Sequence, residues 1–205
     1  DERNSGSMAN DLDGIRRIAL GVRDRLSIDA WRILTDMCDD FARRPKPKVI
    51  RTDEQLAVVE GILGRLSAFA GQVADGMTRD QGWLFLDVGR RLERVIDLAH
   101  LLQFGLLQPD DAEPTRLMAI LEIANSAMTY RSRYVSGPEA ARVLDLLLSD
   151  ETNPRSIGFQ LSMLHQHVRK LRTGRALPQE APELKLVTSA FSDIRLLDVD
   201  ALSRF

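Results

Sequence analysis

The chain has 205 residues and a formal net charge of −2, with acidic and basic residues interspersed along its length. This length is enough to bury a substantial core, and the near-neutral balance excludes a general electrostatic footprint for nucleic acid or an anionic membrane. The one cysteine, Cys38, cannot form an internal disulfide, so we expect a buried, unreactive thiol in a reducing compartment.

Membrane and export signals are not evident. The longest apolar run that stands out, LLQFGLL, is broken by Gly105 and is far shorter than the roughly 20 residues of a membrane-spanning helix. We therefore expect a soluble, cytoplasmic protein that contacts neither membrane nor nucleic acid. The chain opens with Asp1 at what resembles a loop-to-helix junction, which favours a fragment of a longer protein.

Helical periodicity runs through the whole sequence. Apolar residues recur at spacings of three and four, whereas alternating runs are scarce, so we expect an almost entirely helical chain. The first helix is expected over about 7–25, and Ser27 is the expected N-cap of a second helix over 28–42. Two prolines among cations end that helix and make 43–52 the clearest linker.

The middle of the chain predicts three more helices. Thr52 or Asp53 caps the first of these, and its Gly61 and Gly64, three positions apart, predict the close approach of another helix. A long helix follows over about 79–104. Pro114 then suits the first turn of the next helix.

The last third predicts shorter elements. A YRSRY segment precedes Gly137 and Pro138, after which a helix is expected through Leu148. Asn153 is the expected N-cap, with Pro154 at the first helical position, of the helix that follows. One more helix and a short C-terminal turn complete the chain.

An internal duplication is predicted by two loops. DETNPRS, 150–156, shares Asp, Glu, Asn and Ser in register with the opening DERNSGS, 1–7. The match continues into the apolar period at a constant offset, pairing Leu12 with Leu161, Ile15 with Leu164, Ala19 with Val168 and Val22 with Leu171. We therefore expect one all-α domain over 1–205, a duplicated helical array or bundle of about seven to nine helices.

The long helix contains the first candidate site, within WLFLDVGRRLERVIDLA. A helical projection places apolar residues on one side and charged residues on the opposite arc: Asp87, Arg90, Arg91, Glu93, Arg94 and Asp97. The usual interpretation is a solvated face with ion pairs such as Asp87 to Arg91 and Arg90 to Glu93. However, Trp83 projects into this arc, which indicates that part of it faces another helix. Arginines there are either paired with carboxylates or open to an anionic ligand.

The second candidate is the segment with Tyr130, Arg131, Arg133 and Tyr134. Interleaved bases and aromatics can bind nucleic acid, but one short cluster in a near-neutral chain does not favour that function. We expect a structural role instead, in which the tyrosines pack and the arginines bind carboxylates or helix C-termini.

The third candidate is the DETN loop. Asp150 and Glu151 either ligate a hard cation, receive arginines, or simply favour the dipole of the next helix. His165 and His167 point to different faces of their helix and His100 stands alone, so no zinc or di-iron site is predicted. Because glycine-rich phosphate loops are also missing, we expect neither a cofactor nor a complete nucleotide-dependent enzyme.

Three blocks carry a family resemblance: MTRDQGWLFLDVGRRLERVIDLA, AMTYRSRYV and LDLLLSDETNPRSIGFQLSMLHQHV. Together with GVRDRLSIDAWRIL they resemble the bacterial alpha-E domain family, in the family's order and over most of the chain. The resemblance implies an all-helical array in which each half has a Gly-Arg-x-x-Glu-Arg helix and an Asp-x-x-Asn-x-x-Ser loop. Gly89, Arg90, Glu93 and Arg94 form the later such helix; the earlier helix is absent, which implies that the N-terminal third of a complete family domain is missing.

The resemblance also implies a functional setting. Such domains accompany, or are fused to, circularly permuted ATP-grasp proteins and often transglutaminase-like peptidases, which suggests ATP-dependent formation and cleavage of peptide or amide bonds. Carried over as recurring family positions and candidate ligand-binding residues are Arg90, Arg91, Arg94, Tyr130, Arg131, Tyr134, Asp150, Asn153 and Ser156. Glu93 and Glu151 recur as well and are the candidate catalytic residues. Each position either binds ligand or holds the helices together.

Three hypotheses follow. The first is a helical accessory or co-catalytic partner of an ATP-grasp peptide or amide ligase, binding an acidic peptide or acyl-phosphate intermediate through Arg91, Arg94 and Arg131. The second is an enzyme in its own right, with Glu93 or Glu151 as general base or metal ligand between duplicated halves. The third is a pure protein-interaction scaffold whose charges knit helices together. The sequence leaves open whether the domain is catalytic.

Overall fold

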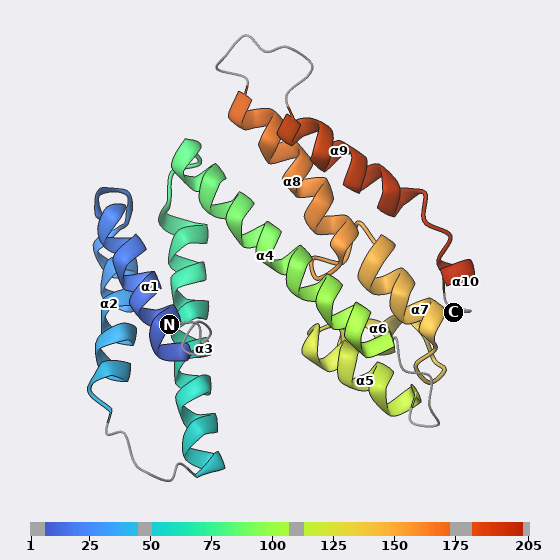
Figure 1. Cartoon of the computed structure of the whole chain (residues 1–205), viewed down its shortest axis with the longest axis horizontal. Helices are drawn as coiled ribbons and strands as arrows, with labels where there is room; N and C mark the ends of the chain where they lie inside the picture. Colours follow the sequence, from blue (N-terminus) through green and yellow to red (C-terminus); the bar gives the residue numbers. More distant parts are fainter. Residues whose placement is uncertain (1–6, 45–50, 107–112, 173–181, 203–205) are drawn as a thin grey trace. The chain divides into compact units, whose positions relative to one another are not determined.

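The computed structural model describes residues 7–44, 51–106, 113–172 and 182–202, and every regular element within these ranges is helical. This confirms the predicted all-α class. The chain divides into two compact units, one up to Gly82 and one from Trp83 onward (Figure 1). The predicted linker, 43–52, joins two helices of the first unit, and its residues 45–50 lie outside the described residues, as does most of the opening loop used to predict a duplication.

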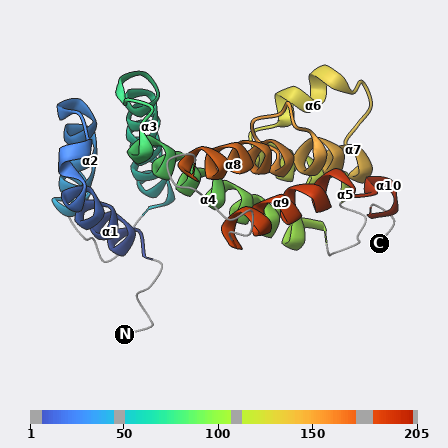
Figure 2. The same cartoon turned by 90° about the horizontal axis from the view of Figure 1, so that it is seen from above.

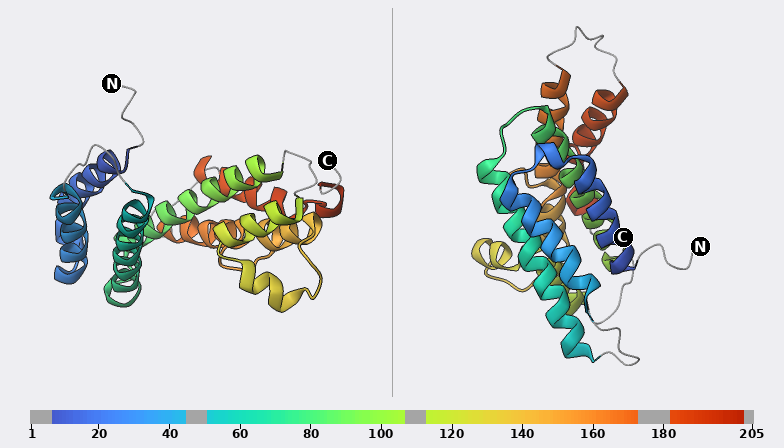
Figure 3. Two further views of the ribbon diagram at one scale, coloured as in Figure 1. Left: turned by 90° about the horizontal axis from the view of Figure 1, so that it is seen from below. Right: turned by 90° about the vertical axis from the view of Figure 1, so that its left-hand side faces the viewer.

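The first unit contains three helices, α1 (Met8–Gly21), α2 (Ile28–Ala42) and α3 (Thr52–Gly76), with a short 3-10 turn, η2 (Arg23–Arg25), between the first two. α2 packs against both α1 and α3, as Figure 3 shows from two directions. The buried core consists of Leu12, Ala19, Leu34, Met37 and Cys38. The predicted first helix over 7–25 is therefore too long, because the α-helix ends at Gly21 and the chain tightens into the 3-10 turn.

Serine side chains start the first two helices. The Ser27 Oγ accepts a hydrogen bond from the Ala30 backbone N–H at 3.1 Å, which confirms the predicted N-cap. The Ser7 Oγ accepts from the Asn10 N–H at 3.3 Å in the same manner. Both contacts satisfy a backbone donor that has no partner inside its helix.

Two expectations for α3 need correction. Nothing lies within 4 Å of a Cβ atom built at Gly61 or Gly64, so in the part of the chain that is described no helix approaches these glycines closely. α3 is also long and apolar enough, by length and composition, to cross a membrane, with a mean hydropathy of 1.3 over an 18-residue window. Glu60 and Arg65 interrupt its apolar sequence, so it contains no long uninterrupted apolar run. Here Arg65 forms an ion pair with Asp40 of α2.

The second unit begins near the start of α4 (Gln81–Leu106). Its other elements are α5 (Glu113–Ile123), α6 (Ala127–Arg133), α7 (Ala140–Leu144), the π-helical turn η3 (Asp145–Ser149), α8 (Ile157–Arg172), α9 (Pro182–Arg195) and α10 (Val199–Leu202). α8 runs beside α9 and also packs against η3, and Figure 2 shows the α8 and α9 pair from above. Leucines of α4, α5, η3 and α8, including Leu98, Leu117, Leu147 and Leu164, fill the core.

The start of α8 differs from its prediction. The Ser156 Oγ accepts from the Phe159 N–H at 2.9 Å, and the Ser156 carbonyl accepts the first intrahelical bond, so Ser156 is the N-cap. Asn153 and Pro154 precede the helix. The Asn153 side chain instead forms a local turn before α8: its Oδ1 accepts from the Arg155 N–H at 3.1 Å, and its Nδ2 donates to the Leu146 carbonyl at 3.0 Å.

Gly158 fixes how closely α8 approaches η3. A Cβ atom at this position would lie 2.8 Å from the Ser149 carbonyl oxygen and 2.9 Å from that of Leu148. Both are backbone atoms and cannot swing away, so the contact requires glycine. The π-helical turn, closed by the Asp150 N–H donating to the Asp145 carbonyl at 3.1 Å, is thereby held against the first turn of α8.

Candidate functional site

The charged arc of α4 is buried only in part: Asp87 and Arg91 lie inside the second unit, whereas Glu93, Arg94 and Asp97 are exposed. Asp87 is 1% exposed and Arg91 is 9% exposed, whereas Leu92, placed on the apolar side, is 42% exposed. Leu84, Leu98 and the buried charges share the face of α4 that packs inside the second unit. The interpretation of the whole arc as a solvated surface is therefore wrong.

Asp87 is the centre of this buried polar network. Its Oδ2 accepts from the Arg91 Nε at 2.5 Å and lies 2.7 Å from the His167 Nε2, while its Oδ1 pairs with Arg90. The predicted pair of Asp87 with Arg91 is thus present, but Arg90 pairs with Asp87 and not with Glu93. Burial acts to raise the pKa of Asp87, but hydrogen bonds from Arg90 and Arg91 outweigh it, and the pKa is lowered.

The network continues from α4 to the start of α8. The Arg91 Nη1 donates to the Gln160 Oε1 at 3.0 Å, and the Gln160 Nε2 donates to the Pro154 carbonyl at 2.5 Å. The Arg91 guanidinium also lies 5.8 Å from the centroid of the Phe159 ring. Arg91 is therefore committed to internal contacts, and its position suits a structural role more than ligand binding.

At the other end of the network, Trp83 of α4 packs against His167 of α8. Their ring centroids lie 5.3 Å apart in an edge-on arrangement. The expectation that Trp83 marks the part of the arc facing another helix is confirmed, because that helix is α8. The His167 Nδ1 is buried and has no hydrogen-bond partner among the described residues.

Arg94 and Arg155 border the network without being part of it. Both are exposed, and within the described ranges neither guanidinium has an ion-pair partner. Partial desolvation and then the positive charges of Arg90, Arg155 and Arg91 lower the pKa of Arg94, and only Asp87 acts in the opposite direction. The guanidiniums of Arg90, Arg91 and Arg155 thus act on that of Arg94, and Asp87, which opposes them, already accepts hydrogen bonds from Arg90 and Arg91. We call Arg90, Arg91, Arg94 and Arg155 the arginine cluster.

The tyrosine and arginine segment at the end of α6 makes internal contacts of the kind that a structural role requires. The Tyr130 hydroxyl donates to the Gly137 carbonyl and accepts from the Glu139 N–H, each at 3.1 Å, and its ring packs 4.8 Å from that of Tyr134. Arg131 is exposed, and its Nη2 lies 3.7 Å from the Met118 sulfur. No contact connects Arg131 with the arginine cluster in the described structure, so the hypothesis of one site shared by Arg91, Arg94 and Arg131 has no geometric support.

The DETN loop contacts α6, η3 and α8. Asp150 forms an ion pair with Arg133 of α6, and its Oδ1 accepts from the Thr152 N–H at 2.7 Å. Burial acts to raise the pKa of Asp150, but hydrogen bonds from Thr152 and Arg133 lower it overall. Asn153 is buried and holds η3 through the Leu146 carbonyl, while the Ser156 hydroxyl also donates to the Asp150 carbonyl. Asp150, Asn153 and Ser156 therefore organise the loop.

The two candidate catalytic carboxylates lie in ordinary surroundings. Glu93 is exposed on α4, and the exposed Glu151 forms a 2.9 Å ion pair with Arg195. Within the described residues, no group of three or more histidine, cysteine, aspartate or glutamate side chains is arranged to hold a metal ion. Neither glutamate touches the arginine cluster through any described contact, so the geometry does not favour the hypothesis of a carboxylate enzyme.

Sequence analysis missed Gln160 and His167. Both lie on the inward stripe of α8 with Leu164, at spacings of four and three, where a residue is expected to be apolar. Polar residues on the buried face of one helix predict polar partners on another, and Asp87 and Arg91, four apart on α4, supply them. Treating the histidines only as potential metal ligands hid this signal.

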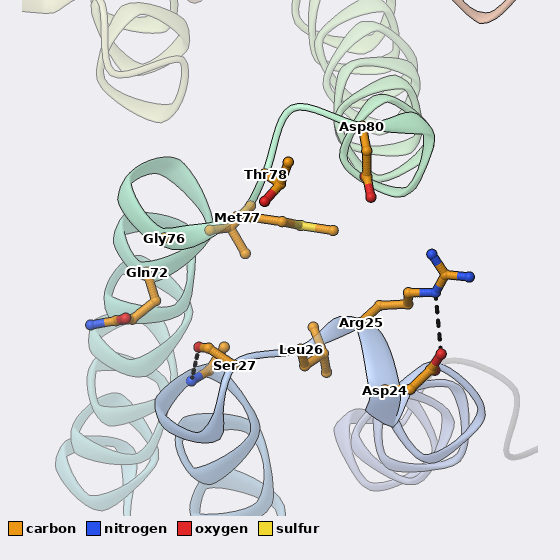
Figure 4. Close-up of a pocket in the computed structure, with 11 residues that line it drawn as sticks. Asp24, Arg25, Leu26, Ser27, Gln72, Gly76, Met77, Thr78 and Asp80 are labelled. Carbon is orange, nitrogen blue, oxygen red and sulfur yellow. Dashed lines mark hydrogen bonds and ion pairs between the residues drawn. The ribbon is translucent and has the colours of Figure 1, made fainter.

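The first unit has a cavity of its own, of about 360 Å³, where η2 and the start of α2 meet the end of α3. Figure 4 shows Gln72 on one side and the Asp24 and Arg25 pair on the other. The Asp24 and Arg25 side chains neutralise each other across 3.2 Å. None of the predicted site residues lines this cavity.

The family is decided by a comparison over the whole chain. The sequence model of the Alpha-E family, described as a predicted alpha-helical domain with a conserved ER motif, matches residues 1–204. The chain belongs to the Alpha-E family. Its sequence has two Glu-Arg pairs, at 2–3 and 93–94, and the first of these lies outside the described residues. The second pair places Arg94 in the arginine cluster, and both Glu93 and Arg94 are exposed.

Relatives of this Alpha-E chain include uncharacterized proteins of Mycobacterium bovis and Mycobacterium tuberculosis, each 32% identical over 171 residues. The matches cover 81% of this chain and 19% of each relative, so the chain spans about a fifth of their length. No solved structure matches the chain significantly.

Proposed function

We propose that this Alpha-E chain is a helical accessory or co-catalytic partner of an ATP-grasp-type peptide or amide ligase. In this role it holds an anionic group, the carboxylate of an acidic peptide or the phosphate of an acyl-phosphate intermediate. The observation that carries the proposal is the pair of exposed guanidiniums of Arg94 and Arg155, which have no ion-pair partner among the described residues and whose charges act together with those of Arg90 and Arg91.

The electrostatics of the arginine cluster support an anionic ligand. Beside desolvation, the positive charges of Arg90, Arg155 and Arg91 lower the pKa of Arg94, and the opposing charge of Asp87 is already shared between Arg90 and Arg91. A bound carboxylate or phosphate relieves this repulsion, and guanidinium groups bind both through paired, charge-assisted hydrogen bonds. The buried Asp87 network stabilises the site by fixing α4 against α8.

The long helix and the DETN block resemble domains that accompany circularly permuted ATP-grasp proteins. We therefore propose an ATP-grasp protein as the partner. A transglutaminase-like peptidase is a second partner in the same setting. In this proposal the ligase supplies ATP chemistry in the cytoplasm, and the Alpha-E chain supplies positioning. The anion contacts shift from Arg91 and Arg131 to Arg94 and Arg155, since Arg91 is internal and Arg131 contacts Met118.

The test is a reconstituted ligation assay. ATP-dependent phosphate release and amide formation by the ATP-grasp protein are measured with and without the Alpha-E chain, over a panel of amino acids and acidic peptides. We expect stimulation by the wild-type chain, its loss in the Arg94→Ala/Arg155→Ala variant, and its retention in Arg17→Ala/Arg169→Ala, which removes two exposed arginines elsewhere. Ligation that is indifferent to the chain, or equal stimulation by both variants, would refute the proposal.

A further inference from the structure

A second cavity, of about 500 Å³, lies in the second unit where η3 and the end of α9 meet. Two arginines and two aspartates line it, Arg142, Arg195, Asp145 and Asp198, together with Tyr134 and Ser149. None of the arginine cluster lines this cavity, so it is a different site from the one proposed above.

The charges around the cavity balance. A ligand that carries only negative charge meets two carboxylates as well as two guanidiniums, and a simple amine meets two guanidiniums as well as two carboxylates. A small molecule with one carboxylate and one ammonium group satisfies both signs at once. The lining therefore discriminates in favour of a zwitterion.

Most of the lining charges are available to such a ligand, although the Asp198 Oδ1 accepts a hydrogen bond from the Ala201 N–H at 3.0 Å and Arg142 also donates to the Ser136 hydroxyl. Arg142 lies 3.3 Å from Glu139, and Arg195 lies 2.9 Å from Glu151, but both pairs are well exposed to solvent. Exposed pairs of this kind contribute little to stability, so a ligand carboxylate can displace them. Asp145 accepts only a long hydrogen bond, 3.4 Å, from the Tyr134 hydroxyl.

One polar atom in the lining is unsatisfied. The Ser149 Oγ is buried and has no hydrogen-bond partner among the described residues. Buried hydroxyl groups are rarely left without a partner in folded proteins. The hydroxyl has almost no accessible surface as it stands, so a ligand in the cavity reaches it only after the Ser149 side chain rotates about its Cα–Cβ bond.

We propose that this cavity binds a small zwitterion of the α-amino acid or dipeptide class. Arg142 and Arg195 receive its carboxylate, and Asp145 and Asp198 receive its ammonium group. Ala141, Leu197 and Val199 also line the cavity and favour a modest apolar side chain. The inference goes beyond the proposed function and does not rest on it.

The first test is calorimetric titration of the full chain with L-valine and L-alanyl-L-valine. Two analogues of valine each retain one charge: 3-methylbutanoate has only the carboxylate, and valinamide has only the ammonium group. We expect at least one zwitterion to bind at least about tenfold more tightly than either analogue. No binding of either zwitterion, or equal binding of an analogue, would overturn the proposal.

Variants then locate the binding. Ser149→Ala removes a hydroxyl that has no partner, so the fold should retain its stability while zwitterion affinity falls. Arg142→Ala should weaken binding about tenfold or more, and Arg169→Ala, an exposed arginine of α8, should leave it unchanged. If Ser149→Ala and Arg142→Ala fold and bind like the wild type, the site is not this cavity. The Arg94→Ala/Arg155→Ala variant should bind normally, which separates this result from failure of the proposed function.

Discussion

The His167 Nε2 lies 2.7 Å from the Asp87 Oδ2, although the two residues are 80 positions apart in the sequence. Asp87 belongs to α4 and His167 to α8, and neither side chain is more than 2% exposed. Asp87 also forms ion pairs with Arg90 and Arg91. One carboxylate therefore joins α4 to α8 and compensates the buried charge of Arg91. The exposed arginines of the cluster are presented from this fixed framework.

Replacing Asp87 with Asn should destabilise the fold strongly. The change removes the charge that compensates Arg91, and an uncompensated buried charge costs about 3–5 kcal/mol. The measurement is the free energy of unfolding from urea denaturation. Asp97→Asn on the same helix is the matched control and should stay within about 0.5 kcal/mol, because Asp97 is exposed. Equal, small effects of the two changes would contradict a central role for Asp87.

Acid should destabilise the protein through Asp87 and Asp150, whose pKa values are lowered in the fold. A carboxylate with a lowered folded-state pKa contributes stability that is present above its unfolded pKa, about 3.9, and is lost as pH falls through the folded value. The free energy of unfolding should therefore hold steady near neutrality and fall below about pH 4. Urea denaturation at stepped pH measures this, and Asp150→Asn should flatten part of the slope. An unchanged slope in that variant would assign the acid sensitivity elsewhere.

Asn153 and Ser156 should differ in what they stabilise. Asn153→Ala leaves the buried Leu146 carbonyl without its donor and should cost about 1–3 kcal/mol. Ser156→Ala removes the N-cap of α8 and should cost about 1 kcal/mol. Hydrogen exchange of the first turn of α8 distinguishes them, since only the Ser156 change should expose the Phe159 N–H. Faster exchange there in Asn153→Ala alone would restore Asn153 as the cap.

Cys38 should react slowly in the folded protein. Burial, as the largest influence, raises the pKa of its thiol, and the Sγ faces the Leu12 carbonyl at 3.4 Å inside the first unit. Thiol reagents attack the thiolate, so labelling at neutral pH should be slower by about 100-fold or more than in urea. Rapid stoichiometric labelling of the native protein by a disulfide reagent would show that the core around Cys38 opens readily.

Local patterns predicted the fold class and several details. Periodicity alone indicated an all-α chain, and the serine before α2 indicated its cap, because both depend on residues within one turn. Trp83 among charges correctly indicated a helix contact, and the structure identifies α8 as the partner. Ser7 and Ser156 cap their helices alike, and Leu12 and Leu161 are both buried, which agrees with the duplication that remains a prediction.

Long-range contacts account for what was missed. Asn153 suits an N-cap by type, but its Oδ1 accepts from the Arg155 N–H in a turn before α8, while its Nδ2 donates to the Leu146 carbonyl. The π-helical turn that contains Leu146 has no clear local signature. The projection of α4 assumed that charges face water, whereas Gln160 and His167 make an inward Asp87 and Arg91 favourable. Pairings across such sequence separations are not evident from the period of one helix.

The most direct test of the central claim is calorimetric titration of the full chain with inorganic phosphate. We predict saturable binding by the wild type and by the Arg17→Ala/Arg169→Ala control, and its loss in Arg94→Ala/Arg155→Ala with no loss of folding stability, since neither side chain has an ion-pair partner to give up within the described residues. Absence of binding by the wild type, or equal binding by both double variants, would contradict an anion site at the arginine cluster.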